Sequence, residues 1–280
     1  MREIDLSIII VHTFEKDQIR QTLRGIKRAA PKLHYEVILV DNNIQSEMKQ
    51  VLKEEFPSAR YLSARGNLGF GGAMNIGIRA ARGKYILIFN PDIVVRPNSL
   101  ETLFDFMEKN PQVGIVGPKL LNPDGSLQYS CFRFPTIMIP VYRRTFLGRM
   151  PFGKKALAHY LMQDDDHNEI MEVDSLIGAA LFTRREALNQ VGLFDERFFM
   201  YYEDNDLCRR FWEKGYKVVY NPQAQMIHYH RRASADGNFW QQLMSKYTRI
   251  QIMSAIKFFL KYRHSADPRR QTTTTMNDDV

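Results

Sequence analysis

Cysteine is scarce in this chain: Cys131 and Cys208 are the only two in 280 residues, and they form no CxxC pair or zinc-ligand spacing. A disulfide framework is therefore not expected, and a reduced, cytoplasmic setting is. The N-terminus lacks a signal peptide, because Arg2, Glu3 and Asp5 lead directly into a short apolar segment. No apolar run approaches the roughly 20 residues that span a bilayer. We expect a soluble or peripheral protein without internal repeats.

The charge balance favours anionic ligands. Lysine and arginine total 39 against 31 acidic residues, for a formal net charge of +8. Such a balance suits a nucleotide, a phosphate group or an anionic membrane surface, without choosing among them. The basic residues are scattered and form no recognised nucleic-acid-binding motif, so nucleic acid is not an expected partner.

Apolar strand-like runs alternate with helical patterns in the first half of the chain. Continuous apolar strands separated by helices indicate an α/β protein with a mainly parallel sheet, covered by helices on both faces. In such sheets ligands bind beyond the carboxyl ends of the strands, where Asp41 and Asp92 fall. The predicted strands are 6–11, 35–40, 59–62 and 85–89, and the predicted helices are 18–30, 48–55 and 73–81.

The second half is less regular. Residues 132–167 are rich in Arg, Lys and Pro with little periodicity, which is typical of an excursion or a flexible subregion. Order returns with strands predicted at 175–182, 217–220 and 226–228, a helix at 185–191 and an amphipathic helix at 239–261. The polar, threonine-rich end is expected to be disordered from about residue 265 to 280.

Three carboxylates, Glu203, Asp204 and Asp206, directly follow the aromatic and methionine cluster of residues 198–202. A carboxylate beside apolar rings is poorly solvated, so its pKa rises towards a value useful for accepting a proton. The alternative is an acidic first turn that opens a helix over 207–212.

Two further patterns leave alternatives open. The glycine-rich segment 66–77 lacks the GxGxxG spacing, and it indicates either a loop beside phosphate or close helix packing. Asp92 follows a strand and could hold Mg²⁺ or Mn²⁺, with His228 as the best imidazole candidate or else a structural histidine. The run 164–167 (Asp-Asp-Asp-His) resembles a metal site, but no hydrophobic element frames it, which favours a solvated loop.

An ordered set of short motifs resembles the family 2 glycosyltransferases, in the bacterial rhamnosyltransferase-like branch that builds cell-surface polysaccharides. Each motif is weak alone, but their order and spacing from about residue 6 to 260 make the set specific. The motifs are Val40-Asp41-Asn42, Asn67-Leu68-Gly69-Phe70 with Asn75-Ile76-Gly77, Phe89-Asn90-Pro91-Asp92, Gly178-Ala179-Ala180, the stretch 191–201, Glu203-Asp204, Asp206-Leu207-Cys208 and His228.

The resemblance implies a GT-A fold, that is, a Rossmann-like and mainly parallel central sheet with helices on both faces, plus a C-terminal helical segment. It implies one glycosyltransferase domain over 1–264. About 1–120 would bind the nucleotide sugar, about 121–230 the acceptor, and about 231–264 would form the C-terminal helices.

The reaction implied is an inverting, Mn²⁺- or Mg²⁺-dependent transfer of a hexose from a nucleotide-diphosphate sugar. Rhamnose from a dTDP donor is the family-level expectation, with UDP and GDP donors open. The acceptor would be a saccharide or a lipid-linked saccharide, and the oligomeric state is not implied.

The family analogy assigns roles to individual residues. Asp204 would be the general base with Glu203 in support, and Asp92 and His228 would hold the metal. Asp41 would read the nucleotide base. The expected donor-binding residues are Val11, His12, Thr13, Asp41, Asn43, Asn67, Gly69, Asn75 and Asn90.

This chain departs from the family pattern at four places. The loop 42–46 (Asn-Asn-Ile-Gln-Ser) stands where the family usually carries a Ser and an Asp, and Ser175 stands where an aromatic residue often precedes the Gly-Ala-Ala stretch. The other two departures are at the first strand and at the DxD motif. Thr13-Phe14 stands where a Tyr-Asn pair usually ends the first strand, so stacking on the base must come from elsewhere, such as His12 or Phe14. The DxD motif begins with Asn90, which leaves Asp92 as its one carboxylate. These changes bear on donor binding more than on chemistry.

Two alternatives to a glycosyltransferase make different demands on the sequence. A sugar nucleotidyltransferase would need a glycine-rich basic loop after the first strand, and residues 12–16 contain no glycine. A non-catalytic module that binds a nucleotide sugar or a polysaccharide would bind without turnover. A further hypothesis is peripheral contact with the inner face of the cell membrane, through the basic excursion 133–155 and the last helix, which otherwise packs on the domain.

Overall fold

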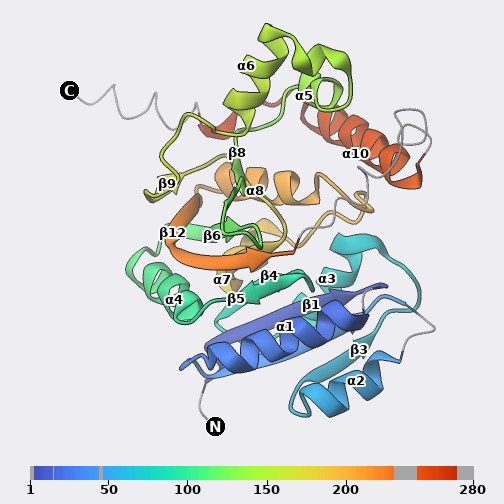
Figure 1. The fold of residues 1–280 in the computed structure, drawn as a ribbon, viewed down its shortest axis with the longest axis vertical. Coiled ribbons are helices and arrows are strands. Elements are labelled where there is room, and N and C mark those ends of the chain that lie inside the picture. Colours follow the sequence, from blue (N-terminus) through green and yellow to red (C-terminus); the bar gives the residue numbers. More distant parts are fainter. Residues whose placement is uncertain (1–2, 15, 44–46, 230–244, 270–280) are drawn as a thin grey trace.

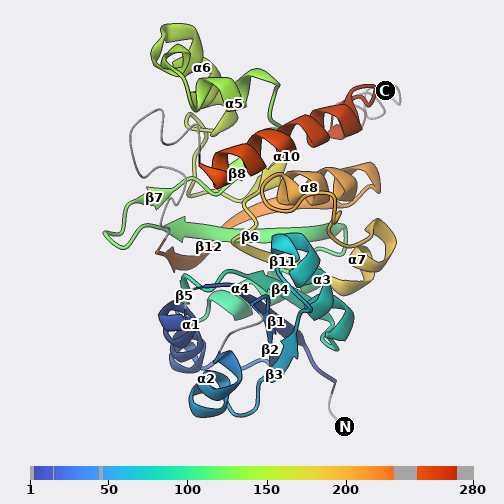
Figure 2. The same cartoon turned by 90° about the vertical axis from the view of Figure 1, so that its right-hand side faces the viewer.

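A twisted mixed sheet lies at the centre of the computed structural model, which describes residues 3–14, 16–43, 47–229 and 245–269 (Figures 1 and 2). The order of its main strands is β3-β2-β1-β4-β11-β6-β12-β5, and β7 and β9 pair at the side with β6 and β12. The strands are β1 Leu6–His12, β2 Tyr35–Asp41, β3 Arg60–Ser63, β4 Tyr85–Phe89, β5 Ile93–Val95, β6 Val113–Leu121, β7 Leu127–Gln128, β9 Met171–Glu172, β11 Ala180–Arg184 and β12 Lys217–His228, with β8 Cys131–Phe132 and β10 Ser175–Leu176 forming a separate pair.

Helices cover both faces of this sheet. One face carries α1 Lys16–Ala29, α2 Met48–Glu55 and α4 Ser99–Lys109, and the other carries α3 Gly69–Ala80, α7 Arg185–Val191 and α8 Glu203–Glu213. Beyond these layers, α5 Met138–Tyr142, the 3₁₀ turn η1 Phe146–Arg149 and α6 Pro151–Tyr160 project from the body, and α10 Lys246–Tyr262 packs on the turn before α8 (Figures 1 and 2).

The strands in the parallel half of the sheet are mostly apolar because both of their faces are buried. β1 pairs in parallel with β2 and with β4, and all seven of its residues are buried. Leu6, Ile8 and Ile10 pack in the cluster that holds α1, α2 and α4. Ile9 and Val11 point to the other face, into the cluster with α3, α7 and α8. The prediction of a mainly parallel sheet between two helical layers is thereby confirmed.

The other half of the sheet differs from the expectation. β11 runs antiparallel between β4 and β6, so the sheet is mixed. The single strand predicted over 175–182 is wrong, because β10 turns away to pair with β8 and the break falls at 177–179. β6 was not anticipated, since Gly114, Gly117 and Pro118 interrupt its apolar pattern. The strands expected at 217–220 and 226–228 form one strand, β12.

The excursion 132–167 is folded, which corrects the expectation of an irregular subregion. It contains α5, η1 and α6, whose helical pattern Pro140, Gly148, Pro151 and Gly153 obscure in the sequence. At the C-terminal end, α10 covers the predicted helix from residue 246 on, and residues 239–244 lie outside the described part.

The first five residues of the expected tail make contacts. The backbone carbonyls of Ser265 and Ala266 accept hydrogen bonds from Arg209, and Arg269 pairs with Asp174 at 2.5 Å. Residues 270–280 lie outside the described part.

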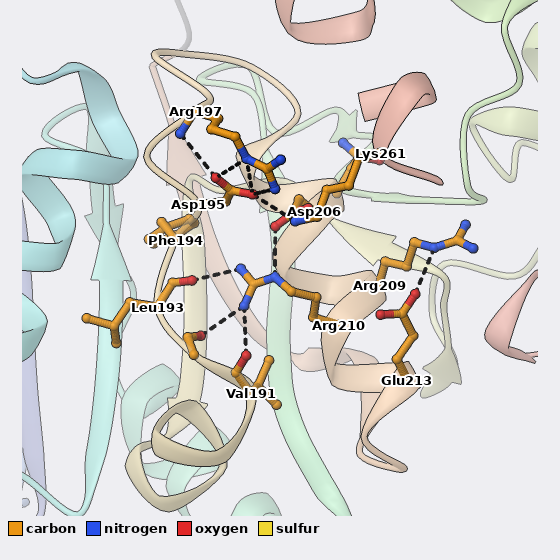
Figure 3. Close-up of polar contacts among 12 residues, drawn as sticks. Val191, Leu193, Phe194, Asp195, Arg197, Asp206, Arg209, Arg210, Glu213 and Lys261 are labelled. Atoms are coloured by element: carbon orange, nitrogen blue, oxygen red, sulfur yellow. Dashed lines mark hydrogen bonds and ion pairs between the residues drawn. The ribbon is translucent and has the colours of Figure 1, made fainter. Parts of the chain in front are cut away.

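A buried carboxylate in the first turn of α8 ties three segments together (Figure 3). Asp206 is fully buried; its Oδ2 accepts from Arg210 Nε at 2.8 Å and its Oδ1 from Tyr262 Oη at 2.7 Å and from Lys261. Arg210 continues to the carbonyls of residues 191, 192 and 193, and Lys261 also reaches Asp195. We call Asp206, Arg210, Lys261 and Asp195 the Asp206 cluster; it fixes α8 against α10 and the loop after α7.

We expect Asp206→Asn to lower the free energy of unfolding by about 3 kcal/mol, because it leaves the cations of a buried cluster uncompensated. Glu213→Gln, which removes the exposed partner of Arg209 in the same helix, is the matched control and should cost less than about 1 kcal/mol. Urea unfolding of both variants measures the difference. Equal losses would show that the cluster does not hold α8.

Candidate active site

Polar residues gather where β1, β2 and β4 end, at one edge of the parallel half of the sheet. His12 and Asp41 are register partners at the ends of β1 and β2. Asn90 and Asp92 follow β4, the neighbour of β1 on its other side. Because parallel strands bring their carboxyl ends to one edge, these residues lie together at that edge.

The Asp41 carboxylate is enclosed by protein groups. Its Oδ1 lies 3.0 Å from His12 Nδ1 and accepts from the Asn43 backbone N–H at 3.2 Å, and its Oδ2 accepts from Tyr61 Oη at 2.8 Å. The Asn43 side chain donates to the Thr13 carbonyl at 2.9 Å. Asp41 is fully buried, so in this structure it joins the ends of three strands, and its role towards a nucleotide base stays a prediction.

The predicted residues Val11, Thr13 and Phe14 differ in exposure. Val11 belongs to the core beneath the site, so only its backbone faces the edge. Thr13 is half-buried and Phe14 is 66% exposed. Of these side chains, Phe14 is the most exposed, so its ring would be accessible to a stacked base.

Asn42 organises the glycine-rich turn, and it was missing from the predicted site. It is buried; its side chain donates to Asn67 Oδ1 at 3.1 Å and to the Gly69 carbonyl at 3.2 Å, and accepts from the Leu68 backbone N–H at 2.9 Å. The signal in the sequence was a polar residue directly after a buried strand. Asn42 thus brings Asn67 and Gly69 to the edge where β2 ends.

Glycine is required where α3 begins. Gly69 has a φ of +75°, and a Cβ there would lie 2.0 Å from the Phe199 carbonyl oxygen. That carbonyl accepts from the Phe70 backbone N–H at 2.9 Å. Of the two readings of the glycine-rich segment, close packing is therefore the one that this position supports, and it draws α3 to the aromatic stretch before Glu203.

The Asn75 side chain, which the sequence predicts to bind the nucleotide-sugar donor, forms hydrogen bonds within the protein in this structure. Its amide nitrogen donates to the Phe194 carbonyl at 2.9 Å and to Glu196 Oε1 at 3.0 Å, and its oxygen accepts from the Phe194 N–H at 3.0 Å. Because the side chain is 1% exposed, it joins α3 to the loop after α7.

Asp92 and His228 meet at the antiparallel ladder of β5 and β12, where His228 pairs with Ile93. Asp92 Oδ1 lies 3.2 Å from His228 Nε2, and this oxygen is buried and accepts no hydrogen bond from any described residue. Gln128 Oε1 lies 2.7 Å from His228 Nδ1. An Nδ1–H of His228 can donate to this amide oxygen, which fixes the ring so that Nε2 faces the carboxylate.

These two atoms fit a divalent cation. Two ligands at about 2.1 Å from a Mg²⁺ or Mn²⁺ ion, at a right angle, lie about 3.0 Å apart, close to the separation found here. The buried Asn90 Oδ1, at the same turn as Asp92, accepts no bond from a described residue. Among the described residues no group of three His, Cys, Asp or Glu side chains converges, so substrate oxygens or water would complete the ligand set.

The acidic run 164–167 is not part of this site. His167 is buried, with its Nε2 2.8 Å from the Met162 carbonyl and its ring against Tyr220. Asp165 faces Arg133 at 3.6 Å, and Asp164 is exposed. The interpretation as a surface loop agrees with these contacts.

Glu203 and Asp204 are the first two residues of α8, and the backbone directly before them has a left-handed conformation that residues other than glycine rarely adopt. Tyr201 and Tyr202, directly before them, have φ values of 71° and 68°. Such strain persists only where packing over-determines it and is concentrated at functional sites. Here the Tyr202 ring packs on Phe258 of α10 at a centroid distance of 5.3 Å, so α10 holds this turn.

The two carboxylates differ in their surroundings. Burial raises the pKa of Asp204, although hydrogen bonds from the Gly178 N–H at 2.9 Å and the Asn205 N–H at 2.8 Å oppose the shift. Burial, and then the charge of Asp204, raise the pKa of Glu203 well above its ordinary value. Glu203 Oε2 accepts no hydrogen bond from a described residue. Asp204 is half-buried and the more accessible of the two.

Residues 177–179, between β10 and β11, connect two parts of the site. One is the turn that carries Glu203 and Asp204, which we call the carboxylate turn, and the other is the turn that carries Asn90 and Asp92. The Gly178 N–H binds Asp204, and the next carbonyl, that of Ala179, accepts from the Asn90 N–H at 2.9 Å. A Cβ on Gly178 would lie 3.4 Å from the Cβ of Asp204, so the contact between them is close. One short segment thus connects Asp204 to the Asn90–Asp92 turn.

Two arginines directly after α5 interact electrostatically with tyrosines near Glu203 and Asp204: Arg143 with Tyr160, and Arg144 with Tyr201 and Tyr202. Arg143 and Arg144 have no carboxylate within ion-pair distance among the residues that the structure covers. Burial raises the pKa of Tyr160 to about 12, and Arg143 opposes this rise while the Asp204 charge adds to it, so these groups act on one another. The sequence marked both arginines as basic residues of an excursion without relating them to Asp204.

Comparison with known proteins identifies relatives over most of the chain. The family model described as Glycosyl transferase family 2 matches residues 7–191. N-acetylglucosaminyl-diphospho-decaprenol L-rhamnosyltransferase of Mycobacterium tuberculosis (strain H37Rv) is 32% identical over 208 residues, which are 69% of this chain and 66% of that protein. Rhamnosyltransferase WbbL of Escherichia coli (strain K12) is 28% identical over 230 residues, 79% of this chain and 82% of WbbL.

Solved structures agree with the fold. The crystal structure of GalNAc-T7 with UDP, GalNAc and Mn²⁺ superposes with a TM-score of 0.62 at 16% identity, over 84% of this chain and 45% of that one. At this identity the likeness concerns the fold alone, which is the GT-A fold.

Glu203→Gln should change the pH dependence of stability in a defined direction. A carboxyl whose folded pKa lies above its unfolded value near 4.3 makes folding less favourable as pH rises from that value, by up to about 1.4 kcal/mol per pH unit until the folded pKa is reached. The variant removes this penalty, so its stability relative to wild type should grow between pH 5 and pH 8. Urea unfolding at both pH values measures the effect.

Glu196→Gln is the control, and its stability relative to wild type should change with pH in the opposite direction. The hydrogen bond from Asn75 and the nearby Arg79 lower the pKa of Glu196, so this carboxylate contributes stability above its unfolded pKa. The variant should therefore become slightly less stable than wild type towards pH 8. A Glu203→Gln difference that does not change with pH would contradict the raised pKa of Glu203.

Proposed function

The chain belongs to the family 2 glycosyltransferases, and from that premise we propose that it is an inverting, metal-dependent hexosyltransferase that uses a nucleotide-diphosphate sugar. The observation that carries the proposal is the joining of Asp204 and Asn90 through Gly178 and Ala179, which unites a base with a divalent-cation site. The rhamnosyltransferase relatives favour rhamnose as the sugar, with dTDP or UDP as the nucleotide. The acceptor is a saccharide or a lipid-linked saccharide.

Asp204 acts as the general base in the proposed reaction. Its raised pKa makes it a better proton acceptor than an ordinary aspartate, and its remaining exposure lets an acceptor hydroxyl approach. As the hydroxyl oxygen attacks the anomeric carbon, its proton passes to Asp204. The bond from that carbon to the diphosphate oxygen breaks on the opposite face, its electron pair leaves with the diphosphate, and the configuration inverts.

Asp92 and His228 would hold the divalent ion, which when bound supplies positive charge to the leaving diphosphate. Gln128 keeps the His228 ring in the tautomer that can ligate. Glu203 lies beside the base, and its preference for the protonated state spares Asp204 a second negative charge. Phe14 and the turn around Asn42 and Gly69 lie at the edge where the nucleotide would enter.

We infer a cytoplasmic reaction, because Cys131 and Cys208 are both buried free thiols, as in a protein of a reducing compartment. No helix in the described part of the chain is long and apolar enough to cross a membrane.

The metal site predicts a graded loss of Mn²⁺ binding. Asp92→Ala should abolish Mn²⁺-dependent binding of dTDP or UDP, and Gln128→Leu should weaken Mn²⁺ affinity about 10–100-fold because the His228 ring loses its orienting partner. Asp164→Asn, an exposed aspartate of the 164–167 run, is the control and should leave binding unchanged. Calorimetric titration of Mn²⁺ into protein with nucleotide measures all three. Unchanged affinity in Gln128→Leu would separate Gln128 from the site.

The activity itself is tested by nucleotide release from dTDP-, UDP- and GDP-sugars with and without Mn²⁺. We expect metal-dependent release from one donor, lowered about 10²–10⁴-fold by Asp204→Asn. Since the base must be deprotonated, the acid limb of kcat/KM should lie above the pKa of an ordinary aspartate, near 3.9. Donor binding without turnover on any acceptor tried would favour a binding module, and a product that retains the donor's anomeric configuration would overturn the inverting mechanism.

A further inference from the structure

The helical excursion over α5, η1 and α6 carries charge of one sign only. Residues 133–160 contain no Asp or Glu but several Arg and Lys residues, among them Arg149, Lys154 and Lys155. These three are exposed and have no carboxylate within ion-pair distance in the described part of the chain. A solvated surface normally mixes both signs, so this one attracts an anionic partner.

The same excursion exposes large apolar side chains. Phe146 is 71% exposed, Ile137 68% and Phe152 53%, and Met138 and Met150 are also exposed. They lie at the end of the molecule away from α1 and α2, where α5 and α6 project from the body (Figures 1 and 2). Several exposed aromatic and aliphatic side chains beside lysines differ from the scattered single ones of an ordinary surface.

Helix α10 extends this surface. Its inner face packs Ala255 and Phe258 against the turn before α8, and its outer face exposes Ile252, Met253, Ile256 and Leu260. Residues 245–263 again contain no Asp or Glu. Arg144, at the end of α5, donates to Gln251 of α10, so the two parts are in contact. We call the exposed residues of α5, η1, α6 and α10 the basic apolar face.

The chemistry of this face suits one kind of partner. Two copies of the chain meeting through it would bring unpaired cations against cations. An anionic lipid bilayer offers phosphate groups to the lysines and an acyl boundary to the phenylalanines at one surface. No helix in the described part could cross a bilayer, so such contact would be peripheral.

We propose that the basic apolar face docks this protein on an anionic lipid bilayer. Docking itself does not depend on the proposed glycosyl transfer. It has a consequence that does: Arg143 and Arg144 directly follow α5, and Arg143 and Asp204 both act on Tyr160 of α6, so a lipid-linked acceptor held in the membrane would present its phosphate to the arginines and its sugar to the base.

Co-sedimentation with vesicles tests the proposal, using phosphatidylcholine with or without phosphatidylglycerol. Wild type should bind the anionic vesicles and not the neutral ones, and salt should weaken the binding. Lys154→Gln/Lys155→Gln should lower the partition constant about thirtyfold, at about 1 kcal/mol for each lysine near the surface. Phe146→Ser/Phe152→Ser should lower it at least about tenfold.

Two matched controls lie elsewhere on the molecule. Lys49→Gln/Lys53→Gln removes the same charge from α2, at the opposite end (Figure 1), and Ile170→Ser removes a side chain that is 44% exposed. Both should bind as wild type does. An equal loss in the lysine control would mean that net charge alone causes binding, and would overturn the proposal.

The remaining outcomes are equally decisive. No binding of wild type to anionic vesicles at low salt would refute docking. A dimer in sedimentation analysis that Phe146→Ser/Phe152→Ser dissociates would assign the face to a second copy. Vesicle binding by an Asp204→Asn protein that releases no nucleotide would support docking, so a failure of docking and a failure of the proposed function can be told apart.

Discussion

The site depends on one buried carboxylate that takes no part in the proposed chemistry. Asp206 fixes the first turn of α8 against α10 and against the loop that Arg210 holds. The proposed base, Asp204, lies two residues earlier in that same turn. Without the cluster, the left-handed backbone at Tyr201 and Tyr202 would have little to oppose its relaxation. The cost of burying Asp206 is thus offset by its bonds, and the result is a rigid frame for Asp204.

For Glu203, unlike Asp206, hydrogen bonds do not offset the cost of burying the carboxyl group. A buried carboxyl with an oxygen that accepts no bond from the described residues is destabilising unless it keeps its proton, and its raised pKa is the physical expression of that cost. In the proposed reaction this cost has a use. A protonated Glu203 beside Asp204 lets only one of the two carry charge, so the pair titrates as a unit and Asp204 remains free to accept the acceptor's proton.

Much of the fold could be predicted from periodicity, because the parallel strands are buried on both faces and read as continuous apolar runs. Parts that depend on a partner far away in sequence could not. Gly178 and Ala179 look like the middle of a strand, and only their bonds to Asp204 and Asn90 reveal the break between β10 and β11. The three short elements of the excursion pack mainly on one another, and Arg144 links them to Gln251 of α10. Their proline and glycine residues obscure a helical period, so the local pattern carries little of their signal.

The residues of the candidate site likewise fall into two groups, those that the sequence could identify and those that only long-range contacts reveal. Asp92, His228, Glu203 and Asp204 were identifiable because carboxylates and an imidazole at strand ends and beside aromatic residues are unusual. Asn42 and Gln128 were not, since an amide acts through the group it orients, and Gln128 meets His228 across 100 residues of chain. Conversely, Asn75 matched a family motif, yet its amide is taken up by Phe194 and Glu196. A motif marks a position, and only the contacts distinguish a ligand from a packing residue.

The small ligand set at Asp92 and His228 has a consequence for the order of binding. Two protein atoms bind a hard divalent ion weakly, because Mg²⁺ and Mn²⁺ complete their shells with several further oxygens. If those oxygens come from the diphosphate of the donor, ion and donor must strengthen each other's binding by the same factor, since coupling free energy is reciprocal. A third carboxylate would have secured the ion without donor, and would also have held it against the departing diphosphate. A site with two protein ligands therefore ties the presence of the ion to the presence of the leaving group that needs it.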